Sequence, residues 1–381
     1  MEFSKNIFYI GANDNKSKLF EGQYEIPNGM GYNSYLIKDE KNVIFDTVDN
    51  NVKDKWIENF ENALNGEKVD YLIISHMEPD HAYNIGVIAK KYPEMKIVGN
   101  AMTFNILSKF FDFDLSERKV IVKEGDILNI GEHTLEFYMA PMVHWPEVMV
   151  TYEQTKKILF SADAFGKFGE IKENDEWVDE ARRFYIGIVG KYGQQVQGLL
   201  KKVSKLEIKT ICPLHGPILK DNLEYYLEKY DKWSRYEPEE EGCLIACSSI
   251  YGNTLDAAKF LEEKLKEQGK NVKLIDLTKE EWSKPVAEAF KYSKLIVASS
   301  SYNAGVFPAM EHFLNNLKAR NYQKRKVAII ENGSWAPTAA KTMKNILQEM
   351  KDIDIIEPII TIESTMKEKN KLELIELANK I

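Results

Sequence analysis

Cysteine is scarce in this sequence. The 381 residues include Cys212, Cys243 and Cys247, and no two of them form a Cys-x-x-Cys pair. An odd number of isolated cysteines argues against both a disulfide framework and a thiolate metal site. Cys243 and Cys247 alternate with apolar residues, a pattern typical of small core residues in a buried strand. We therefore expect no disulfide and no cysteine-ligated metal.

The chain also lacks a long apolar run and an excess of positive charge. No stretch approaches the roughly 18 apolar residues that a membrane-spanning helix needs, and the N-terminal residues show no secretory pattern. The formal net charge is −8, with acidic and basic residues interspersed, unlike the basic track of a nucleic-acid-binding protein. We therefore expect a cytoplasmic protein with neither a membrane nor a nucleic acid as partner.

The length and the rhythm of the sequence predict two domains. A chain of 381 residues is long for a single core. Up to about residue 235, short strand patterns with helices between them suggest two sheets covered by helices. The charged stretch 236–242 is typical of a linker, and strands and helices then alternate strictly, which predicts a doubly wound, five-stranded parallel sheet. We place the domains at 1–240 and 241–381.

The segment 75–81, Ser-His-Met-Glu-Pro-Asp-His, directly follows an apolar, strand-like stretch and carries four potential metal ligands. They are His76, Glu78, Asp80 and His81. Imidazoles and carboxylates this close repel one another when charged and cost free energy to desolvate, so they need a compensating cation. The segment therefore predicts a metal centre.

Three isolated residues are candidates to complete a binuclear site. His144, Asp163 and His215 each follow apolar residues and precede a Gly, Pro or aromatic turn signal. Loops at one edge of a sheet collect functional groups in this way. We expect all seven side chains to converge on one site.

A phosphate-binding pattern opens the second domain, between a strand-like run and an amphipathic helix. Its residues are Ser248, Ser249, Ile250, Tyr251, Gly252, Asn253 and Thr254. Backbone N–H groups and hydroxyls at a helix N-terminus can bind a phosphate without a lysine. The loop is neither a Walker motif nor a Gly-x-Gly-x-x-Gly turn, and it resembles the flavodoxin phosphate loop for FMN.

Two later loops supply backbone donors and flat side chains at the same predicted sheet edge. One contains Ser300, Ser301, Tyr302, Asn303, Ala304 and Gly305, and the other contains Asn332, Gly333, Ser334 and Trp335. An isoalloxazine ring needs such neighbours. Tyr302 and Trp335 are therefore candidates to line a flavin.

The ordered set His-x-Glu-x-Asp-His, His, Asp, His resembles the metal signature of the metallo-β-lactamase-like fold, in the variant carried by flavodiiron proteins. The resemblance extends to Tyr32-Asn33-Ser34-Tyr35, His144-Trp145-Pro146-Glu147, the segment 161–166 and His215-Gly216-Pro217. It covers essentially the whole chain, because that family appends a flavodoxin-like domain. The resemblance implies an α/β protein with an N-terminal metallo-β-lactamase-like αββα sandwich, followed by a flavodoxin-like, FMN-binding sheet.

The resemblance also implies a division of the ligands. One iron would be held by His76, Glu78 and His144, the other by Asp80, His81 and His215, with Asp163 bridging them. The hydrolytic members usually carry His at the position of Glu78, and the extra carboxylate suits iron better than zinc. Tyr185 matches a family tyrosine that can donate a hydrogen bond to a bound intermediate. The chain departs from the family pattern at Ala82-Tyr83-Asn84, and before Tyr32 it lacks a His that some members place near the metals.

A dimetal site combined with a flavin favours redox chemistry, since a flavin adds nothing to hydrolysis and can pass electrons to iron. The resemblance implies an enzyme that reduces dioxygen to water, nitric oxide to nitrous oxide, or both. It further implies a head-to-tail homodimer or a dimer of dimers, and a separate rubredoxin-like electron donor, because the chain has no rubredoxin module. Two alternatives are a zinc-dependent hydrolase that activates a bridging water, with an accessory flavodoxin-like domain, and a non-catalytic electron carrier.

Overall fold

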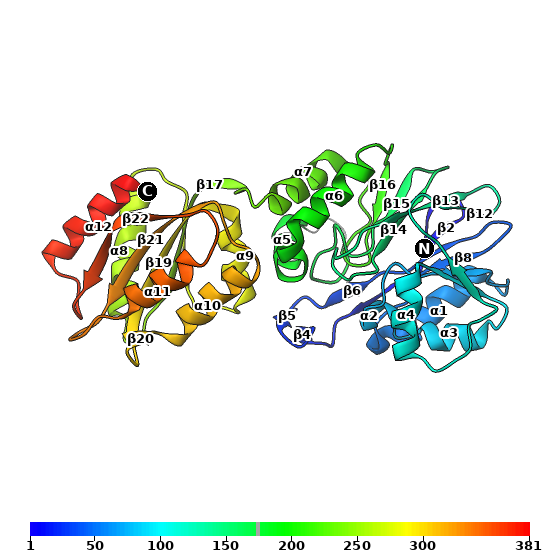
Figure 1. Cartoon of the computed structure of the whole chain (residues 1–381), viewed down its shortest axis with the longest axis horizontal. Coiled ribbons are helices and arrows are strands. Elements are labelled where there is room, and N and C mark those ends of the chain that lie inside the picture. The colour runs from blue at the N-terminus through cyan, green and yellow to red at the C-terminus, as the bar shows by residue number, and fades with distance from the viewer. Residues whose placement is uncertain (173–175) are drawn as a thin grey trace. The chain divides into compact units, whose positions relative to one another are not determined.

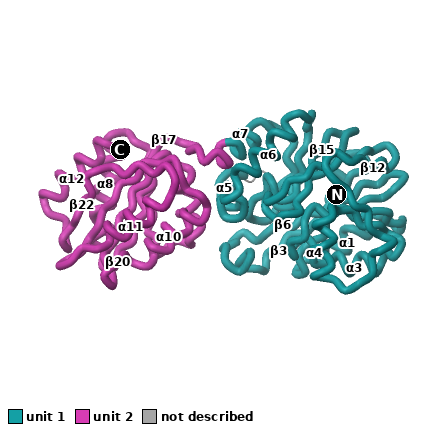
Figure 2. The backbone as a smooth tube through the Cα atoms, in the orientation of Figure 1, with its two compact units in different colours: residues 1–231 teal, residues 232–381 magenta. Residues whose placement is uncertain are grey.

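The computed structural model describes residues 1–172 and 176–381 (Figure 1). The chain divides into two compact units, residues 1–231 and 232–381 (Figure 2). Strand β17 (Glu240–Ser248) begins inside the stretch 236–242 that the sequence predicted as a linker. That linker prediction was wrong at its C-terminal end, because the backbone there continues the sheet: Glu240 pairs with Tyr292 of the neighbouring strand.

Unit 1 contains two mixed sheets, one of seven strands in the order β1-β2-β7-β8-β9-β10-β11 and one of five in the order β12-β13-β14-β15-β16. The first comprises β1 (Glu2–Ser4), β2 (Ile7–Tyr9), β7 (Tyr35–Ile37), β8 (Val43–Phe45), β9 (Tyr71–Ile73), β10 (Lys96–Gly99) and β11 (Lys119–Ile121). The second comprises β12 (Ile127–Asn129), β13 (Thr134–Met139), β14 (Met149–Glu153), β15 (Ile158–Phe160) and β16 (Thr210–Cys212). Two further two-stranded pairs join β3 (Ala12–Asp14) with β6 (Met30–Tyr32) and β4 (Leu19–Phe20) with β5 (Tyr24–Glu25).

One hydrophobic core joins the two sheets of unit 1. Phe45 of the first sheet stacks on Phe160 of the second, with ring centroids 3.9 Å apart. In β13 the buried residues Leu135 and Phe137 alternate with less buried ones, as expected for a strand with one face in a core. Burying each such side chain stabilises the fold by about 1.5–3 kcal/mol. The strand ends that carry polar residues are therefore held in a rigid frame.

Helices cover both sheets of unit 1. They are α1 (Lys53–Leu64), α2 (Pro79–Ala82), α3 (Ile85–Lys91), α4 (Ala101–Phe110), α5 (Val178–Phe184), α6 (Gly193–Val203) and α7 (Leu223–Ser234), with one π-helix (Tyr185–Val189) and short 3-10 turns (Asn50–Val52 and Gly190–Tyr192). Helices α1, α3 and α4 lie on the side of the seven-stranded sheet, and α6 and α7 on the side of the five-stranded sheet (Figure 1). The predicted αββα sandwich is confirmed.

Unit 2 is a doubly wound sheet of parallel strands in the order β18-β17-β19-β21-β22. Besides β17 these are β18 (Val272–Asp276), β19 (Tyr292–Tyr302), β21 (Arg325–Asn332) and β22 (Ile353–Ile362), and β20 (Gly305–Val306) pairs with the end of β19. The helices are α8 (Asn253–Glu267), α9 (Ser283–Lys291), α10 (Pro308–Ala319), α11 (Ala339–Gln348) and α12 (Glu368–Lys380). Helix α8 packs against α12, and α10 packs against α9 and α11. The predicted five-stranded parallel sheet is confirmed.

The cysteines and the helices agree with two expectations from the sequence. Cys243 and Cys247 are buried in the core of unit 2 beside Ile245. Within the described residues, no helix is both long enough and apolar enough to cross a membrane.

Candidate metal centre and ligand pocket

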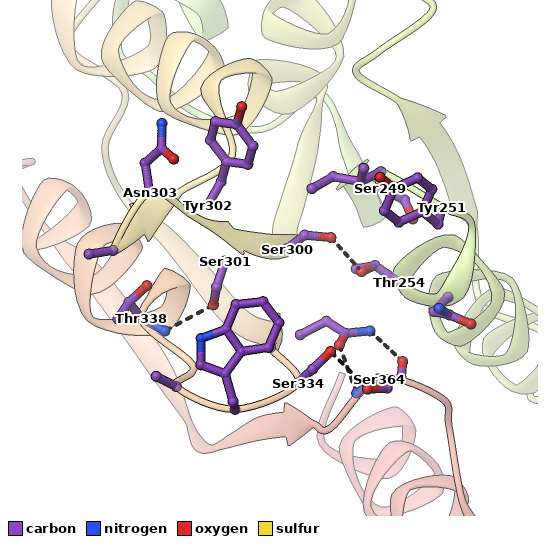
Figure 3. A pocket seen from close by; sticks show the side chains of 17 residues that line it. Ser249, Tyr251, Thr254, Ser300, Ser301, Tyr302, Asn303, Ser334, Thr338 and Ser364 are labelled. Carbon is purple, nitrogen blue, oxygen red and sulfur yellow. Dashed lines mark hydrogen bonds between the residues drawn. The ribbon is translucent and has the colours of Figure 1, made fainter.

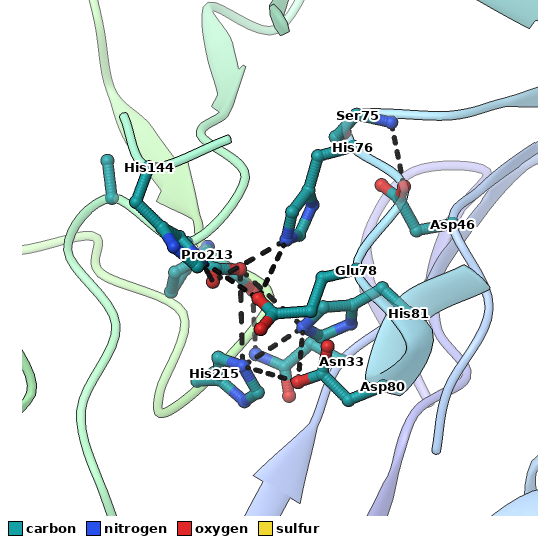
Figure 4. Close-up of polar contacts among 12 residues, drawn as sticks. Asn33, Asp46, Ser75, His76, Glu78, Asp80, His81, His144, Pro213 and His215 are labelled. Carbon is teal, nitrogen blue, oxygen red and sulfur yellow. Dashed lines mark hydrogen bonds and ion pairs between the residues drawn. The ribbon is translucent and has the colours of Figure 1, made fainter. Parts of the chain in front are cut away.

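The predicted ligands come together at one edge of the unit 1 sheets (Figure 4). They stand on the segment after β9, the loop before β14, the loop after β15 and the loop after β16. Three overlapping groups each offer ligand atoms that lie within 4.8 Å of one another. The groups are His76, Glu78, His144 and Asp163; His76, Asp80 and His81; and His81, Asp163 and His215.

Asp163 lies between two pairs of imidazoles. Its Oδ2 is 3.6 Å from His76 Nε2 and 3.2 Å from His144 Nε2. Its Oδ1 is 3.5 Å from His81 Nε2 and 4.0 Å from His215 Nε2. Each oxygen of this carboxylate therefore faces a different set of ligand atoms.

The other two carboxylates each belong to one of these sets. Glu78 Oε2 is 2.8 Å from His144 Nε2 and 3.5 Å from His76 Nε2. Asp80 Oδ2 is 3.3 Å from both His81 Nε2 and His215 Nε2. The cluster thus divides into two carboxylate-imidazole groups that share Asp163.

The local sequence explains this division. Glu78 is extended and precedes α2, and Pro79 takes the first position of that helix, where its missing N–H costs nothing. Glu78 stands on extended backbone and His76 precedes it outside any helix or strand, whereas Asp80 and His81 lie in the helical turn. The change of backbone conformation at Pro79 therefore turns the two pairs of side chains in different directions.

Burial and the neighbouring side chains have opposing effects on several pKa values in the cluster. Burial alone would lower the pKa of His144, but its contacts with the carboxylates of Asp163 and Glu78 outweigh burial and raise that pKa to about 10. Burial and the charge of Glu78 raise the pKa of Asp80 to about 6. Burial also opposes ionisation of Asp163, yet the imidazole of His76 holds the pKa of this carboxyl well below its usual range. Carboxylates thus stay ionised in this cluster although burial disfavours their charged form.

Polar atoms at the centre of the cluster show that its residues fit metal ions. Among the described residues, His76 Nε2 and both carboxylate oxygens of Asp80 and of Asp163 have no hydrogen-bond partner. Buried polar atoms are almost always paired, so atoms of this kind need another partner. Nitrogen and oxygen donors without a thiolate, including three carboxylates, suit a hard or intermediate metal such as iron.

A hydrogen-bonded loop orients His215. Its Nδ1 lies 2.8 Å from the Gly31 carbonyl oxygen, which can only accept, so Nδ1 donates and Nε2 faces the cluster. Asn33 Nδ2 donates to the carbonyl oxygens of Pro213 at 2.7 Å and Gly216 at 2.8 Å. The φ angle of Gly216 is +77°, in the left-handed region that glycine adopts without strain. These contacts give a structural role to segments 32–35 and 215–217, which carry part of the family resemblance.

Aromatic rings surround His215. The ring centroids of Phe20, Tyr32 and Phe184 lie 5.5, 5.5 and 5.3 Å from that of His215. The sequence reasoning missed Phe20 and Phe184, because neither lies in a motif. The surroundings of this imidazole are therefore largely apolar.

A further carboxyl group, also missed, reaches the cluster from the β4–β5 hairpin. Glu21 is exposed overall, but its carboxyl group lies beside Glu78, and loss of hydration together with the charge of Glu78 raises the pKa of Glu21 to about 7. Glu21 lies in the segment before Tyr32, where the sequence showed no histidine. The sequence signal for this hairpin was weak, because β4 and β5 are only two residues long.

Tyr185 is the first residue of the π-helix and is fully buried. Its ring packs edge-on against Tyr230, with centroids 5.0 Å apart. The Tyr230 hydroxyl in turn accepts a hydrogen bond from the N–H of Phe165, two residues after Asp163. Tyr185 is thus connected to the Asp163 loop through Tyr230.

Unit 2 has a pocket of about 330 Å³ at the carboxyl ends of β17, β19 and β21 (Figure 3). The predicted residues that line it are Ser249, Ile250, Tyr251, Asn253, Thr254, Ser300, Ser301, Tyr302, Asn303, Ala304, Asn332, Gly333, Ser334 and Trp335. The predicted residues Ser248, Gly252 and Gly305 are outside the lining, and Ala336, Thr338 and Ser364 line it without having been predicted.

The three outlying residues support the pocket walls. Ser248 is buried and its hydroxyl bonds that of Ser299 at 2.8 Å. Gly252 has a φ of +97° at the start of α8, and the Gly305 carbonyl accepts a hydrogen bond from Thr338 Oγ1 at 2.9 Å. Whether such a residue lines the pocket or supports its wall depends on the backbone conformation of the loop, which sequence patterns do not predict.

The chemistry of the lining fits FMN. Hydroxyl, amide and aromatic side chains line the pocket, and none of its lining residues is charged. The N-terminus of α8 offers backbone N–H groups to a phosphate. Tyr251 and Trp335 are 93% and 92% exposed, which leaves their flat faces free to pack on a planar ring.

Comparisons with known proteins find matches for both units. Residues 30–216 match the ODP family beta lactamase model, and residues 244–370 match a flavodoxin domain model. The chain is 29% identical to an uncharacterized protein of Methanocaldococcus jannaschii over 391 aligned positions, covering 100% of this chain and 98% of that protein. It is 27% identical to the anaerobic nitric oxide reductase flavorubredoxin of Salmonella typhi, covering 90% of this chain and 74% of that protein.

Solved structures show the same architecture over the whole chain. A flavo di-iron protein of Thermotoga maritima has a TM-score of 0.88 and 26% identity, covering 98% of this chain and 95% of its own. The rubredoxin oxygen:oxidoreductase of Desulfovibrio gigas has a TM-score of 0.91 and 24% identity, covering 100% and 97%, and shows a likeness of fold. Since a metallo-β-lactamase-like unit with this ligand cluster precedes a flavodoxin domain in one chain, the protein belongs to the flavodiiron proteins.

Proposed function

We propose that this protein is a flavodiiron oxidoreductase that reduces dioxygen to water, nitric oxide to nitrous oxide, or both. The observation that carries the proposal is the position of Asp163, whose two carboxylate oxygens face two separate groups of imidazoles. A shared carboxylate of this kind suits a pair of metal ions. A neutral pocket for FMN in the same chain supplies the second component of a redox enzyme.

The distances support the ligand division implied by the family resemblance. In the proposal, one iron would be held by His76, Glu78 and His144 and the other by Asp80, His81 and His215, with Asp163 shared between them. When bound, iron and FMN supply reversible electron transfer to a small diatomic molecule. The protein's own part is to orient the ligands, as the Gly31 carbonyl does for His215.

The surroundings of the cluster suit a small neutral gas. The rings of Phe20, Tyr32 and Phe184 keep water away from one side of His215. Tyr185 stays a proposed hydrogen-bond donor to a bound intermediate, and its link to the Asp163 loop through Tyr230 supports this.

The names of related proteins guide the choice of reaction and partner. One relative is named a nitric oxide reductase flavorubredoxin and one structural neighbour a rubredoxin oxygen:oxidoreductase. We therefore propose dioxygen or nitric oxide as substrate and a rubredoxin-like donor of electrons. The head-to-tail homodimer or dimer of dimers, the cytoplasmic location and the domain extents 1–240 and 241–381 stay predictions.

The zinc-hydrolase alternative is not favoured. Solved flavodiiron structures match the whole chain, and relatives named as reductases match most of it. A hydrolase would have no use for the flavodoxin domain at residues 244–370.

Metal analysis and gas consumption test the proposal. We expect about two irons per cluster and about one FMN per chain, with rapid consumption of dioxygen or nitric oxide by the reduced protein. Zinc as the only metal, or no consumption of either gas after full reduction, would contradict it. His81→Ala should abolish turnover while the FMN spectrum is kept. His312→Ala, at an exposed position of α10 in unit 2, is the matched control and should leave turnover intact.

A further inference from the structure

Glu147 belongs to no ligand group of the cluster, yet it contacts the backbone that carries two of the ligands. We propose that Glu147 is a positioning residue whose carboxylate holds the N–H of Met77 and so fixes the directions of His76 and Glu78 before metal binds. The inference rests on the proposed function of the cluster as a diiron centre. It concerns a residue that makes no contact with the metals themselves.

The orientation of His76 must come from its backbone. Among the described residues, neither ring nitrogen of His76 has a hydrogen-bond partner. His215, by contrast, is oriented through its Nδ1 by the Gly31 carbonyl. Metal-binding imidazoles are commonly oriented by a hydrogen bond from the ring nitrogen that does not bind the metal, as His215 is. His76 lacks it, so the backbone on either side of it has to be held.

Two buried carboxylates hold that backbone. Glu147 Oε1 accepts the N–H of Met77 at 2.8 Å, and Asp46 Oδ1 accepts the N–H of Ser75 at 2.7 Å (Figure 4 shows the second bond). The Ser75 carbonyl also accepts the N–H of Met149 at 2.9 Å. The peptide groups on both sides of His76 are therefore fixed by hydrogen bonds.

The two carboxylates come from different sheets. Asp46 directly follows β8 of the seven-stranded sheet, and Glu147 precedes β14 of the five-stranded sheet. Glu147 is itself held, because its carbonyl accepts a hydrogen bond from Asn100 Nδ2 at 2.6 Å. Glu147 also lies three residues after His144. One residue thus links the loop of His144 to the segment of His76 and Glu78, the three ligands proposed for one iron.

The hydrogen bond and the charge of Glu147 can be separated by substitution. The side chain is 1% exposed, and Oε2 has no hydrogen-bond partner within the described part of the chain. A glutamine has nearly the same shape and can still accept the Met77 N–H, whereas an alanine cannot. If positioning is the role, Glu147→Gln should keep it and Glu147→Ala should lose it.

The test measures Fe²⁺ binding to the metal-free, full-length protein without oxygen, by competition with a chromogenic chelator. The parent protein should bind two ions. Glu147→Ala should bind one of them about 10 to 100 times more weakly, the usual effect of removing a partner that orients a metal ligand. Glu147→Gln should bind both as the parent does. Amide hydrogen exchange at Met77 in the metal-free protein should accelerate in Glu147→Ala and not in Glu147→Gln.

Glu153→Gln is the matched control. Glu153 is also buried, lies at the far end of β14, and accepts the N–H groups of Thr155 and Lys156; its substitution should leave both Fe²⁺ affinities unchanged. The inference is refuted if Glu147→Ala binds both ions as tightly as the parent, or if Glu147→Gln is as impaired as Glu147→Ala. If the parent binds no Fe²⁺, the proposed function fails, and exchange at Met77 still tests the positioning role separately. Retained FMN in each variant shows that the flavodoxin domain has folded.

Discussion

Replacing Asn33 by leucine should weaken both the fold and the metal centre. Asn33 Nδ2 donates to the carbonyl oxygens of Pro213 and Gly216, on either side of the ligand His215. Leucine has a similar volume but no donor, so both hydrogen bonds are lost without a large cavity. The loss in the free energy of unfolding depends on which other hydrogen-bond partners each carbonyl oxygen keeps.

The two carbonyls differ in what they keep. The Pro213 oxygen retains the Tyr35 hydroxyl at 2.6 Å, so losing Asn33 there costs about 0.5–1.5 kcal/mol, the net value of one hydrogen bond. The Gly216 oxygen is left without its Asn33 partner in a buried loop, which costs about 1–3 kcal/mol. Together these give a loss of about 1.5–4.5 kcal/mol in the free energy of unfolding of the metal-free protein.

Urea denaturation of the metal-free protein measures this loss, and chelator competition measures the accompanying fall in Fe²⁺ affinity. Asn59→Leu is the control, because Asn59 Nδ2 makes one hydrogen bond, to the Gly11 carbonyl at 2.8 Å. It should cost about 1–3 kcal/mol and leave the Fe²⁺ affinity unchanged. If Asn33→Leu is as stable as the parent and binds iron as tightly, the role assigned to the His215 loop is wrong.

Further predictions concern pH and the flavin. Contacts with the carboxylates of Asp163 and Glu78 raise the pKa of His144 to about 10 in the metal-free protein despite burial, so we expect metal binding to displace a proton. Fe²⁺ affinity should therefore rise as the pH approaches that value, and titration calorimetry in buffers of different ionisation enthalpy should detect the released proton. Burial opposes ionisation of Glu153, but the hydrogen bond from His133 and two backbone N–H groups lowers the pKa of Glu153 below its usual value. Its stabilising effect should be complete above the unfolded pKa of about 4.3 and disappear as the pH falls through the folded value, so Glu153→Gln should be destabilised at neutral pH and approach the parent in acid, as followed by urea denaturation. Trp335→Ala should raise the Kd for FMN by about tenfold, the loss of about 1.4 kcal/mol of ring contact, while iron content is unchanged; fluorescence titration of the flavin-free protein checks this, and an unchanged Kd would exclude Trp335 from the flavin contact.

The sequence was most informative where rare residue types stood at predictable places. The proposed metal ligands His76 and Asp163 follow short apolar strands, and their ligand atoms meet in one cluster. The loops that line the pocket of unit 2 were predictable for the same reason, because strand and helix alternate strictly in that unit. Periodicity and turn signals therefore carried both the fold class and the set of side chains that converge.

Features that depend on contacts between distant segments were not predictable. Phe184 and Glu21 reach the cluster from α5 and from the β4–β5 hairpin. Helix α5 has the sequence Val-Asp-Glu-Ala-Arg-Arg-Phe, in which Arg182 and Arg183 are buried and paired with acidic residues. Such burial hides the amphipathic pattern on which sequence reasoning depends. The role of Glu147 was not predictable from its motif, because the hydrogen bond that it accepts from Met77 spans 70 positions of the chain.

The carboxylate of Asp163 has a thermodynamic consequence for metal loading. Its two oxygens belong to one rigid planar group, and each faces a different set of imidazoles. An ion bound on one side fixes the plane of that group and so prepares the other side for the second ion. By linkage the second ion changes the affinity for the first by the same factor. The two binding events are therefore coupled through one side chain, and the affinity measured for either ion depends on whether the other ion is already bound.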